Sequence, residues 1–425
     1  MERNISTPRS FSRRDFIKAT SAVSLAAVAG PASVFAAGEE KIRVGVIGCG
    51  GRGTGATIDC LRADPAVEVV AMGDLFQDRL DGSLRRLKKD FADRVKVTPE
   101  TMFTGFDNYK KVCAIEEVDL IVTAAPPHFR PIHLEECVRQ GKHVFMEKPV
   151  CVDAVGARKV IEASKQAKAK KLGIVAGTQR RHQASYIEAM KRIHDGAIGE
   201  IVGGQCYWNM GGLWVKEKKP EWSEMEWQCR NWLYFTWLSG DHIVEQHVHN
   251  IDVINWAMGG PPKKAMGMGG REVRTEDKYG NIFDHFAIEF EYDNGARVMS
   301  MCRQTPNTAT RVSERLVGTK GVSDPRQWIS GENEWRFSGE AKNPYVVEHA
   351  DLIASIRAGE PLNEGQRVAE SCLTAIMGRM SAYTGKALSW KWLVNASKLD
   401  LSPEAYEFGP VETRPAATPG KTPLI

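Results

Sequence analysis

The sequence predicts an α/β protein in two parts, a doubly wound parallel sheet followed by an α+β domain with a mainly antiparallel sheet. Three observations predict this. A glycine cluster follows the first apolar run after residue 40, apolar runs then alternate with helical segments, and beyond residue 200 the runs have the alternating pattern of antiparallel strands. Regular strand–helix alternation requires parallel strands with helices on both faces. We expect domains over 40–178 and 179–400 and a tail over 401–425.

The first 37 residues have the layout of an export signal. Two adjacent arginines lie in the segment SRRDFIK (12–18), and an Ala/Ser/Thr-rich apolar stretch follows, interrupted by Gly30 and Pro31. This stretch makes a poor membrane span and lacks the polar face of an amphipathic helix, which is the alternative. We predict a twin-arginine signal over 1–37 that is cleaved near Ala36, and a periplasmic or other extracytoplasmic location.

The charge balance argues against a polyanionic partner. The net charge is +4, and residues 1–36 contribute +3 of it with five basic and two acidic side chains, so the remainder carries only +1. A chain this close to neutrality has no bulk attraction to nucleic acid or anionic membrane. We therefore expect no nucleic-acid partner and no membrane span in the mature chain.

The nine cysteines have no CxxC spacing, and most fall within apolar patterns. Buried, unreactive thiols are the expected result, with at least one unpaired because the number is odd. A disulfide between Cys206 and Cys229 remains open. The cysteines give no indication of a metal site.

The glycine cluster has the spacing of a dinucleotide-binding loop. It comprises Gly48, Gly50, Gly51 and Gly53, with Arg52 before the last glycine. The pattern G-x-G-x-x-G between a strand and a helix lets a pyrophosphate lie against the helix N-terminus. Asp74 ends the next apolar run, 21 residues after Gly53, where a carboxylate binds the adenosine ribose. We predict a Rossmann domain that binds NAD, with NADP possible because Arg79 lies close to Asp74.

Further polar residues follow the later strands of this sheet. The expected strands cover 119–126, 143–147 and 172–179. Ligands of such sheets bind outside the carboxyl ends of the strands. Among the residues at these ends, those expected to contact the cofactor are Pro126, His128, Glu147, Lys148 and Gln179.

The second domain combines a hairpin signal with clustered tryptophans. Asn294 and Gly295 form a turn signal between two alternating runs. All eleven tryptophans follow residue 207, and six lie between Trp208 and Trp237. Whether these side chains pack the core or stack on sugar rings remains open. We select Trp232 as a substrate contact.

Acidic and histidine side chains share one helical face over 239–260. Asp241, Glu245, His249 and Asp252 have helical spacing, and His242 and His247 lie beside them. Such a cluster is compatible with a metal, but hydride chemistry requires none, and we predict no metal. The side chains expected to contact substrate are Arg181, Trp232, Asp241, His242, Glu245 and His249.

The motifs VGVIGCGGRG, Asp74 and HVFMEKPV together resemble the Gfo/Idh/MocA family of sugar and cyclitol oxidoreductases. The resemblance implies a Lys148 beside the nicotinamide, a His249 that acts on the substrate hydroxyl, and a large open-faced sheet used for substrate and oligomer contacts. Glu245 and His247 depart from the family pattern, which has aspartate and glycine at these positions. The resemblance also implies a homo-oligomer, a dimer or tetramer.

Together, these residues predict an oxidoreductase that transfers a hydride between NAD(P) and a secondary hydroxyl of a sugar, sugar derivative or cyclitol. His249 is the expected base, and Lys148 is the cation that stabilises the alkoxide. Glu245 is expected either to orient an imidazole or to bind a sugar hydroxyl. A redox-neutral glycosidase or lyase cycle through a keto-sugar and a non-catalytic carbohydrate-binding protein remain alternatives. Export of a folded protein predicts a tightly bound cofactor, retained by the tail after Ser402 or by a neighbouring subunit. The tail itself is expected to wrap a neighbour or to be mobile.

Overall fold

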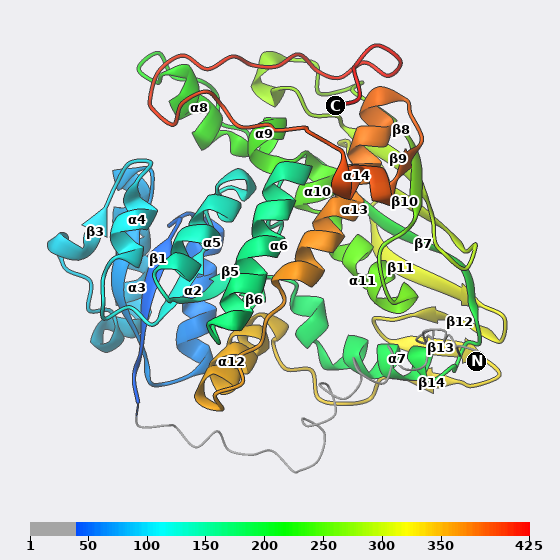
Figure 1. Ribbon diagram of the computed structural model, residues 1–425, viewed down its shortest axis with the longest axis horizontal. Coiled ribbons are helices and arrows are strands. Elements are labelled where there is room, and N and C mark those ends of the chain that lie inside the picture. Colours follow the sequence, from blue (N-terminus) through cyan, green and yellow to red (C-terminus); the bar gives the residue numbers. More distant parts are fainter. Residues whose placement is uncertain (1–39) are drawn as a thin grey trace, which may run out of the picture. The chain divides into compact units, whose positions relative to one another are not determined.

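The computed structural model describes residues 40–425 (Figure 1). The predicted export signal lies outside the described residues. No helix among residues 40–425 combines the length and the apolar character that a membrane crossing needs. All nine cysteines are buried and free, so Cys206 and Cys229 do not form a disulfide.

The first sheet is parallel throughout and has the predicted doubly wound order, β3-β2-β1-β4-β5-β6. The order reverses between β1 and β4, which creates a crevice at the carboxyl ends of these two strands. The strands are β1 (Ile42–Ile47), β2 (Val67–Gly73), β3 (Met102–Phe103), β4 (Leu120–Thr123), β5 (His143–Met146) and β6 (Ile174–Ala176).

Alternate side chains of these strands enter two different hydrophobic clusters. Val46 and Val122 pack with residues of the first two helices, whereas Ile47 and Ile121 pack with residues of the next three. Helices therefore cover both faces of the sheet, as predicted. They are α2 (Gly51–Ala63), α3 (Gln77–Phe91), α4 (Asn108–Cys113), α5 (Arg130–Arg139) and α6 (Ala154–Ala169).

The second sheet has nine strands in the order β14-β13-β12-β11-β7-β10-β9-β8-β15. It is mainly antiparallel, as predicted, with β7 and β10 as a parallel pair. Gly295 has a φ of +85° in the predicted turn between β9 and β10. The strands are β7 (Ile201–Met210), β8 (Lys264–Gly270), β9 (His285–Glu291), β10 (Arg297–Gln304), β11 (Arg311–Gly318), β12 (Gly321–Asp324), β13 (Trp328–Gly331), β14 (Trp335–Arg336) and β15 (Leu388–Ser389).

Helices cover one face of this sheet and leave the other face open. On the open face, Met266 is 66% exposed and Met268 is 73% exposed. The helices after residue 180 are α7 (Ala184–His194), α8 (Glu224–Arg230), α9 (Thr236–Ser239), α10 (His242–Glu245), α11 (Val248–Met258), α12 (Pro344–Arg357), α13 (Gly365–Thr384) and α14 (Trp390–Asn395). The long helix α13 contacts both α6 and β8 and so joins the two halves of the chain.

The C-terminal tail packs on its own chain, which corrects the expectation of a mobile or neighbour-wrapping segment. The carbonyl of Gly409 accepts a hydrogen bond from the Met225 amide at 3.1 Å, and the Gly420 amide donates to the Thr384 carbonyl at 3.1 Å. Figure 1 shows the tail in red, passing over α8 and α9.

Candidate active site

The glycine loop between β1 and α2 allows close approach of backbone segments. Gly48 has a φ of +88°, and a Cβ there would lie 2.4 Å from the Ala125 nitrogen. A Cβ on Gly53 would lie 1.8 Å from the Gly48 carbonyl oxygen, whereas Gly50 and Gly51 face open space. The loop therefore forms a cradle at the N-terminus of α2, which fits the pyrophosphate of a dinucleotide.

Asp74 lies at the end of β2, beside this cradle. Its carboxylate accepts hydrogen bonds from the backbone amides of Cys49 at 2.6 Å and Phe76 at 2.9 Å. Burial raises the pKa of Asp74 above its ordinary value. The two amides fix the orientation of the carboxylate and leave lone pairs for a ribose diol.

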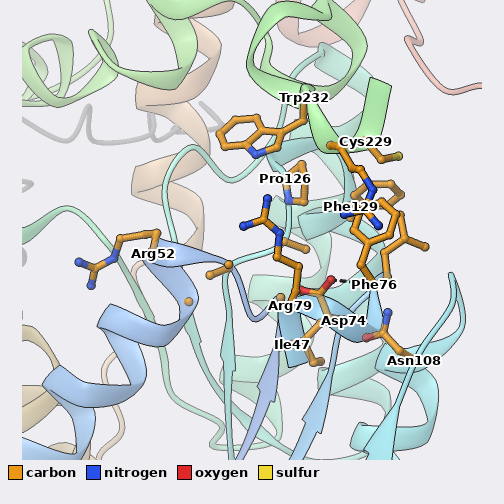
Figure 2. Close-up of a pocket in the computed structure, with 18 of the residues that line it drawn as sticks. Ile47, Arg52, Asp74, Phe76, Arg79, Asn108, Pro126, Phe129, Cys229 and Trp232 are labelled. Atoms are coloured by element: carbon orange, nitrogen blue, oxygen red, sulfur yellow. Dashed lines mark hydrogen bonds between the residues drawn. The ribbon is translucent and has the colours of Figure 1, made fainter. Parts of the chain in front are cut away.

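A cavity of about 450 Å³ joins the glycine loop, Asp74 and a wall from the second half of the chain. Figure 2 shows the Arg79 side chain beside Asp74 and the Trp232 indole above Arg79 and Pro126. Trp232, which we expected to contact the substrate, therefore lines the candidate cofactor cavity. Trp214, Lys216 and Arg230 line the same wall, and no motif in the sequence marked them as cofactor contacts.

Two of the expected cofactor contacts have other partners. His128 is buried, and its Nε2 atom lies 2.8 Å from the Tyr406 hydroxyl of the tail, while burial lowers the pKa of His128 to about 4. The amide nitrogen of Gln179 donates to the Tyr345 hydroxyl at 3.1 Å. Neither side chain lines the cavity, whereas Pro126 does.

Arg52 and Glu147 form an ion pair at the edge of the site. The Arg52 Nε atom lies 2.7 Å from the Glu147 carboxylate, and the same guanidinium binds Asp59 at 3.2 Å. Figure 2 shows Arg52 turned away from the residues around Asp74. A Cβ on Gly177 would lie 2.5 Å from the other Glu147 oxygen, so Glu147 braces the loop that carries Lys148.

Lys148 and Glu245 meet between the two halves of the chain. The Lys148 ammonium donates to the backbone carbonyl of Glu245 and lies 3.1 Å from its carboxylate. The two side chains are 13% and 15% exposed, so the pair faces a small opening. Lys148 follows β5 and Glu245 ends α10, so the fold brings together two residues that are far apart in the sequence.

His249 lies on α11 next to this pair. Its ring stacks on Trp208 with a centroid distance of 5.7 Å and an interplanar angle of 21°. Burial, and then the positive charges of Lys148 and Arg180, hold the pKa of His249 well below its ordinary value. The imidazole is therefore neutral at pH 7 and able to accept a proton.

Arg180 completes this end of the site. Its guanidinium pairs with the buried Glu314 and lies 5.9 Å from the centre of the Trp208 ring. Arg180 and His249 thus contact the same indole. The arrangement places two cations, Lys148 and Arg180, near one neutral imidazole.

Two residues expected at the substrate, Arg181 and Asp241, have structural positions instead. Arg181 makes two hydrogen bonds to the Asp252 carboxylate, at 2.7 and 2.9 Å, and lies over Trp256. The Asp241 carboxylate accepts from the Phe283 amide at 2.8 Å and from the Tyr383 hydroxyl at 2.6 Å. Arg181 and Asp241 therefore stabilise the packing of the second domain, and we do not include them in the candidate site.

His242 and His247 also belong to the packing. His242 is fully buried and forms a T-shaped contact with Phe286, and His247 lies 2.7 Å from the Ser300 hydroxyl. Within residues 40–425, no group of three or more His, Cys, Asp or Glu side chains has an arrangement that could hold a metal ion.

Comparison with known proteins gives two family matches. Residues 42–174 match the model described as "Oxidoreductase family, NAD-binding Rossmann fold", and residues 186–323 match "GFO/IDH/MocA C-terminal domain". The two matched segments correspond to the two sheet-containing halves of the fold.

Curated relatives are distant and only partly covered. The chain is 25% identical over 251 residues to 2,7-anhydro-N-acetylneuraminate hydratase of Escherichia coli strain K12, covering 58% of this chain and 62% of that protein. It is 26% identical over 259 residues to inositol 2-dehydrogenase 3 of Saccharopolyspora erythraea, covering 60% of this chain and 65% of that protein. The chain thus spans less than two thirds of the length of these relatives.

The fold is shared with solved structures. The aldose-aldose oxidoreductase of Caulobacter crescentus, in complex with glycerol, matches with a TM-score of 0.65 at 17% identity. That match covers 82% of this chain and 100% of the other.

Proposed function

The chain belongs to the GFO/IDH/MocA family of NAD-binding oxidoreductases, and on this basis we propose that it transfers a hydride between NAD(P) and a secondary hydroxyl of a sugar, sugar derivative or cyclitol. The observation that carries this proposal is the contact of Lys148 with Glu245 beside a neutral His249. Lys148 follows the carboxyl end of β5, in the same sheet as the strand β1 that leads into the glycine cradle, while Glu245 and His249 come from α10 and α11. NAD(P), when bound, accepts the hydride in the oxidative direction.

The protein supplies the acid–base chemistry. His249 takes the hydroxyl proton, since its depressed pKa keeps a ring nitrogen unprotonated. Lys148 stabilises the negative charge that develops on the substrate oxygen. Glu245 holds the ammonium of Lys148 through its carbonyl and its carboxylate, and so fixes the direction of that charge.

Two matched relatives support the substrate class. An inositol dehydrogenase and a hydratase of an anhydro-sugar acid are among the curated proteins that the chain resembles. Asp74 favours NAD, because a carboxylate at the ribose repels a 2′-phosphate, and Arg79 in the same cavity leaves NADP as a second cofactor. The open sheet face with Met266 and Met268 supports a homo-oligomer.

We place the mature protein outside the cytoplasm. The adjacent Arg13 and Arg14 and the apolar stretch that follows them support export by the twin-arginine route. A dehydrogenase in that location needs a cofactor that stays bound. This requirement also keeps the redox-neutral cycle as a second candidate, because that cycle returns the hydride and consumes no free NAD.

An activity screen tests the proposal. The purified protein is incubated with NAD or NADP and a panel of free sugars, cyclitols and glycosides, and both cofactor reduction and aglycone release are measured. Cofactor reduction supports the dehydrogenase, and aglycone release without net reduction supports the redox-neutral cycle. Carbohydrate binding without either reaction would contradict both and leave a non-catalytic binding protein.

A further inference from the structure

One wall of the candidate cofactor cavity comes from a segment far from the glycine loop in sequence. We call residues 213–232 the cap; they include α8 and the chain before it. The cap residues that line the cavity are Trp214, Lys216, Cys229, Arg230 and Trp232. Lys216 adds positive charge to that of Arg79, which suits the two negative charges of a pyrophosphate.

The cap is tied directly to the Rossmann half. The Arg230 guanidinium pairs with Asp78 of α3 at 3.2 Å. It also lies 3.8 Å from the centre of the ring of Phe76, two residues after Asp74. These contacts join the cap to the ribose end of the cavity.

The cap is also internally ordered. The Lys216 amide donates to the Asn231 side chain at 2.8 Å, and the Trp227 indole donates to the Lys216 carbonyl at 2.7 Å. Trp227 itself is buried against Phe235. Lys216 is thus held by its backbone at a position that lines the cavity.

The C-terminal tail supports the cap and the aromatic wall from outside. The Gln228 amide donates to Thr413 at 2.8 Å. The Phe408 ring lies 5.3 Å from Phe106 and 6.0 Å from Phe76, two rings that line the cavity. Phe408 does not line the cavity itself, so it acts through these rings.

From these contacts we propose that the cap, supported by the tail, forms the second half of the dinucleotide site and slows release of the cofactor. The inference rests on the proposed function, because the ligand is the adenine dinucleotide of that reaction. Lys216 binds the pyrophosphate, Trp214 and Trp232 cover the dinucleotide, and Phe408 is a positioning residue. The cofactor leaves only when the cap separates from Phe76 and Asp78.

Release of the cofactor tests this inference. The protein is loaded with NAD, passed through a gel-filtration column, and the dinucleotide that remains is measured by mass spectrometry over time. For Lys216→Ala and for Phe408→Ala we expect release at least about tenfold faster than in the wild type, the factor that corresponds to a loss of about 1.4 kcal/mol. Phe337→Ala is the matched control, since Phe337 packs on Trp335 at the far edge of the second sheet.

The outcomes separate the inference from the proposed function. Wild-type release as fast as in both variants would overturn the cap inference and leave the oxidoreductase proposal standing. A wild-type protein that takes up neither NAD nor NADP would overturn both. Thermal unfolding of each variant is measured alongside, and faster release from a variant as stable as Phe337→Ala supports the inference.

Discussion

At the glycine loop the protein presents backbone to the cavity, whereas around Lys148 it presents charged side chains that each have a partner. Gly50 and Gly51 face open space, and Asp74 is oriented by two backbone amides. At the other end, Lys148 pairs with Glu245 and Arg180 pairs with Glu314. Cofactor binding at the glycine loop therefore depends on the shape of the backbone, whereas catalysis around Lys148 depends on charged side chains. Substitutions in the two regions should affect binding and turnover separately.

The largest expected effect lies at the charged end. Lys148→Ala and His249→Ala should each lower turnover by about 100-fold or more, the scale of a positioned acid–base group. Cofactor retention should remain, because neither side chain lines the nucleotide cavity. The measurement is single-turnover hydride transfer on protein loaded with NAD. Near-normal turnover in either variant would remove that residue from the mechanism.

At the glycine loop, Gly53→Ala should weaken NAD binding by about tenfold or more, which corresponds to a loss of about 1.4 kcal/mol in binding free energy. The new Cβ would lie 1.8 Å from the Gly48 carbonyl oxygen, so the loop must move. Gly55→Ala is the control on the same helix, because its Cβ would meet Arg52 at an ordinary 3.6 Å. Calorimetric titration gives both affinities. Equal affinities would show that the cradle does not depend on this close approach.

The same comparison explains which residues the sequence could predict. Asp74 directly follows β2 and Lys148 lies two residues beyond β5, so their position at the sheet edge is a local property of the chain. The partners of other residues are distant, since Asp252 lies 71 positions from Arg181 and Tyr383 lies 142 positions from Asp241. Spacing along one helix cannot reveal such partners, so side chains committed to packing resembled candidate substrate ligands.

The cap contains cavity-lining residues that the sequence alone did not reveal. Its tryptophans were visible as a cluster, but the sequence gives no sign that this cluster lies over the glycine loop. Trp214 and Trp232 line the cavity beside the glycine loop only because the folded chain brings together segments that are more than 150 residues apart in the sequence. The sheets themselves were predictable, because strand alternation and the Asn294-Gly295 turn are local patterns.

Substitution of Arg181 should lower the free energy of unfolding and leave KM almost unchanged. Arg181→Ala leaves the buried Asp252 with Arg367 and Ser371 alone, and we expect a loss of about 3 kcal/mol in the free energy of unfolding. KM should stay within about twofold of wild type, as for a residue that makes no substrate contact. Arg192→Ala removes a partly exposed pair with Glu188 and serves as the control. Denaturant unfolding and steady-state kinetics are the measurements, and a large rise in KM would return Arg181 to the substrate site.

The smallest expected effect concerns kcat/KM, which should hardly change with pH near neutrality. An exposed histidine has a pKa near 6.5, so about three quarters of it would be protonated at pH 6 and inactive as a base. The pKa of His249 is held well below that value by burial and by the charges of Lys148 and Arg180. Protonation therefore begins only at lower pH, and kcat/KM in the oxidative direction should be nearly constant between about pH 6 and pH 7, since it reports the groups of the free enzyme. A pH profile of kcat/KM, with unfolding followed in the same buffers, is the measurement. An inflection near pH 6.5 in folded protein would mean that the base titrates like an exposed histidine. His249 would then not be the buried base beside Lys148 and Arg180 that distinguishes this region from the glycine loop.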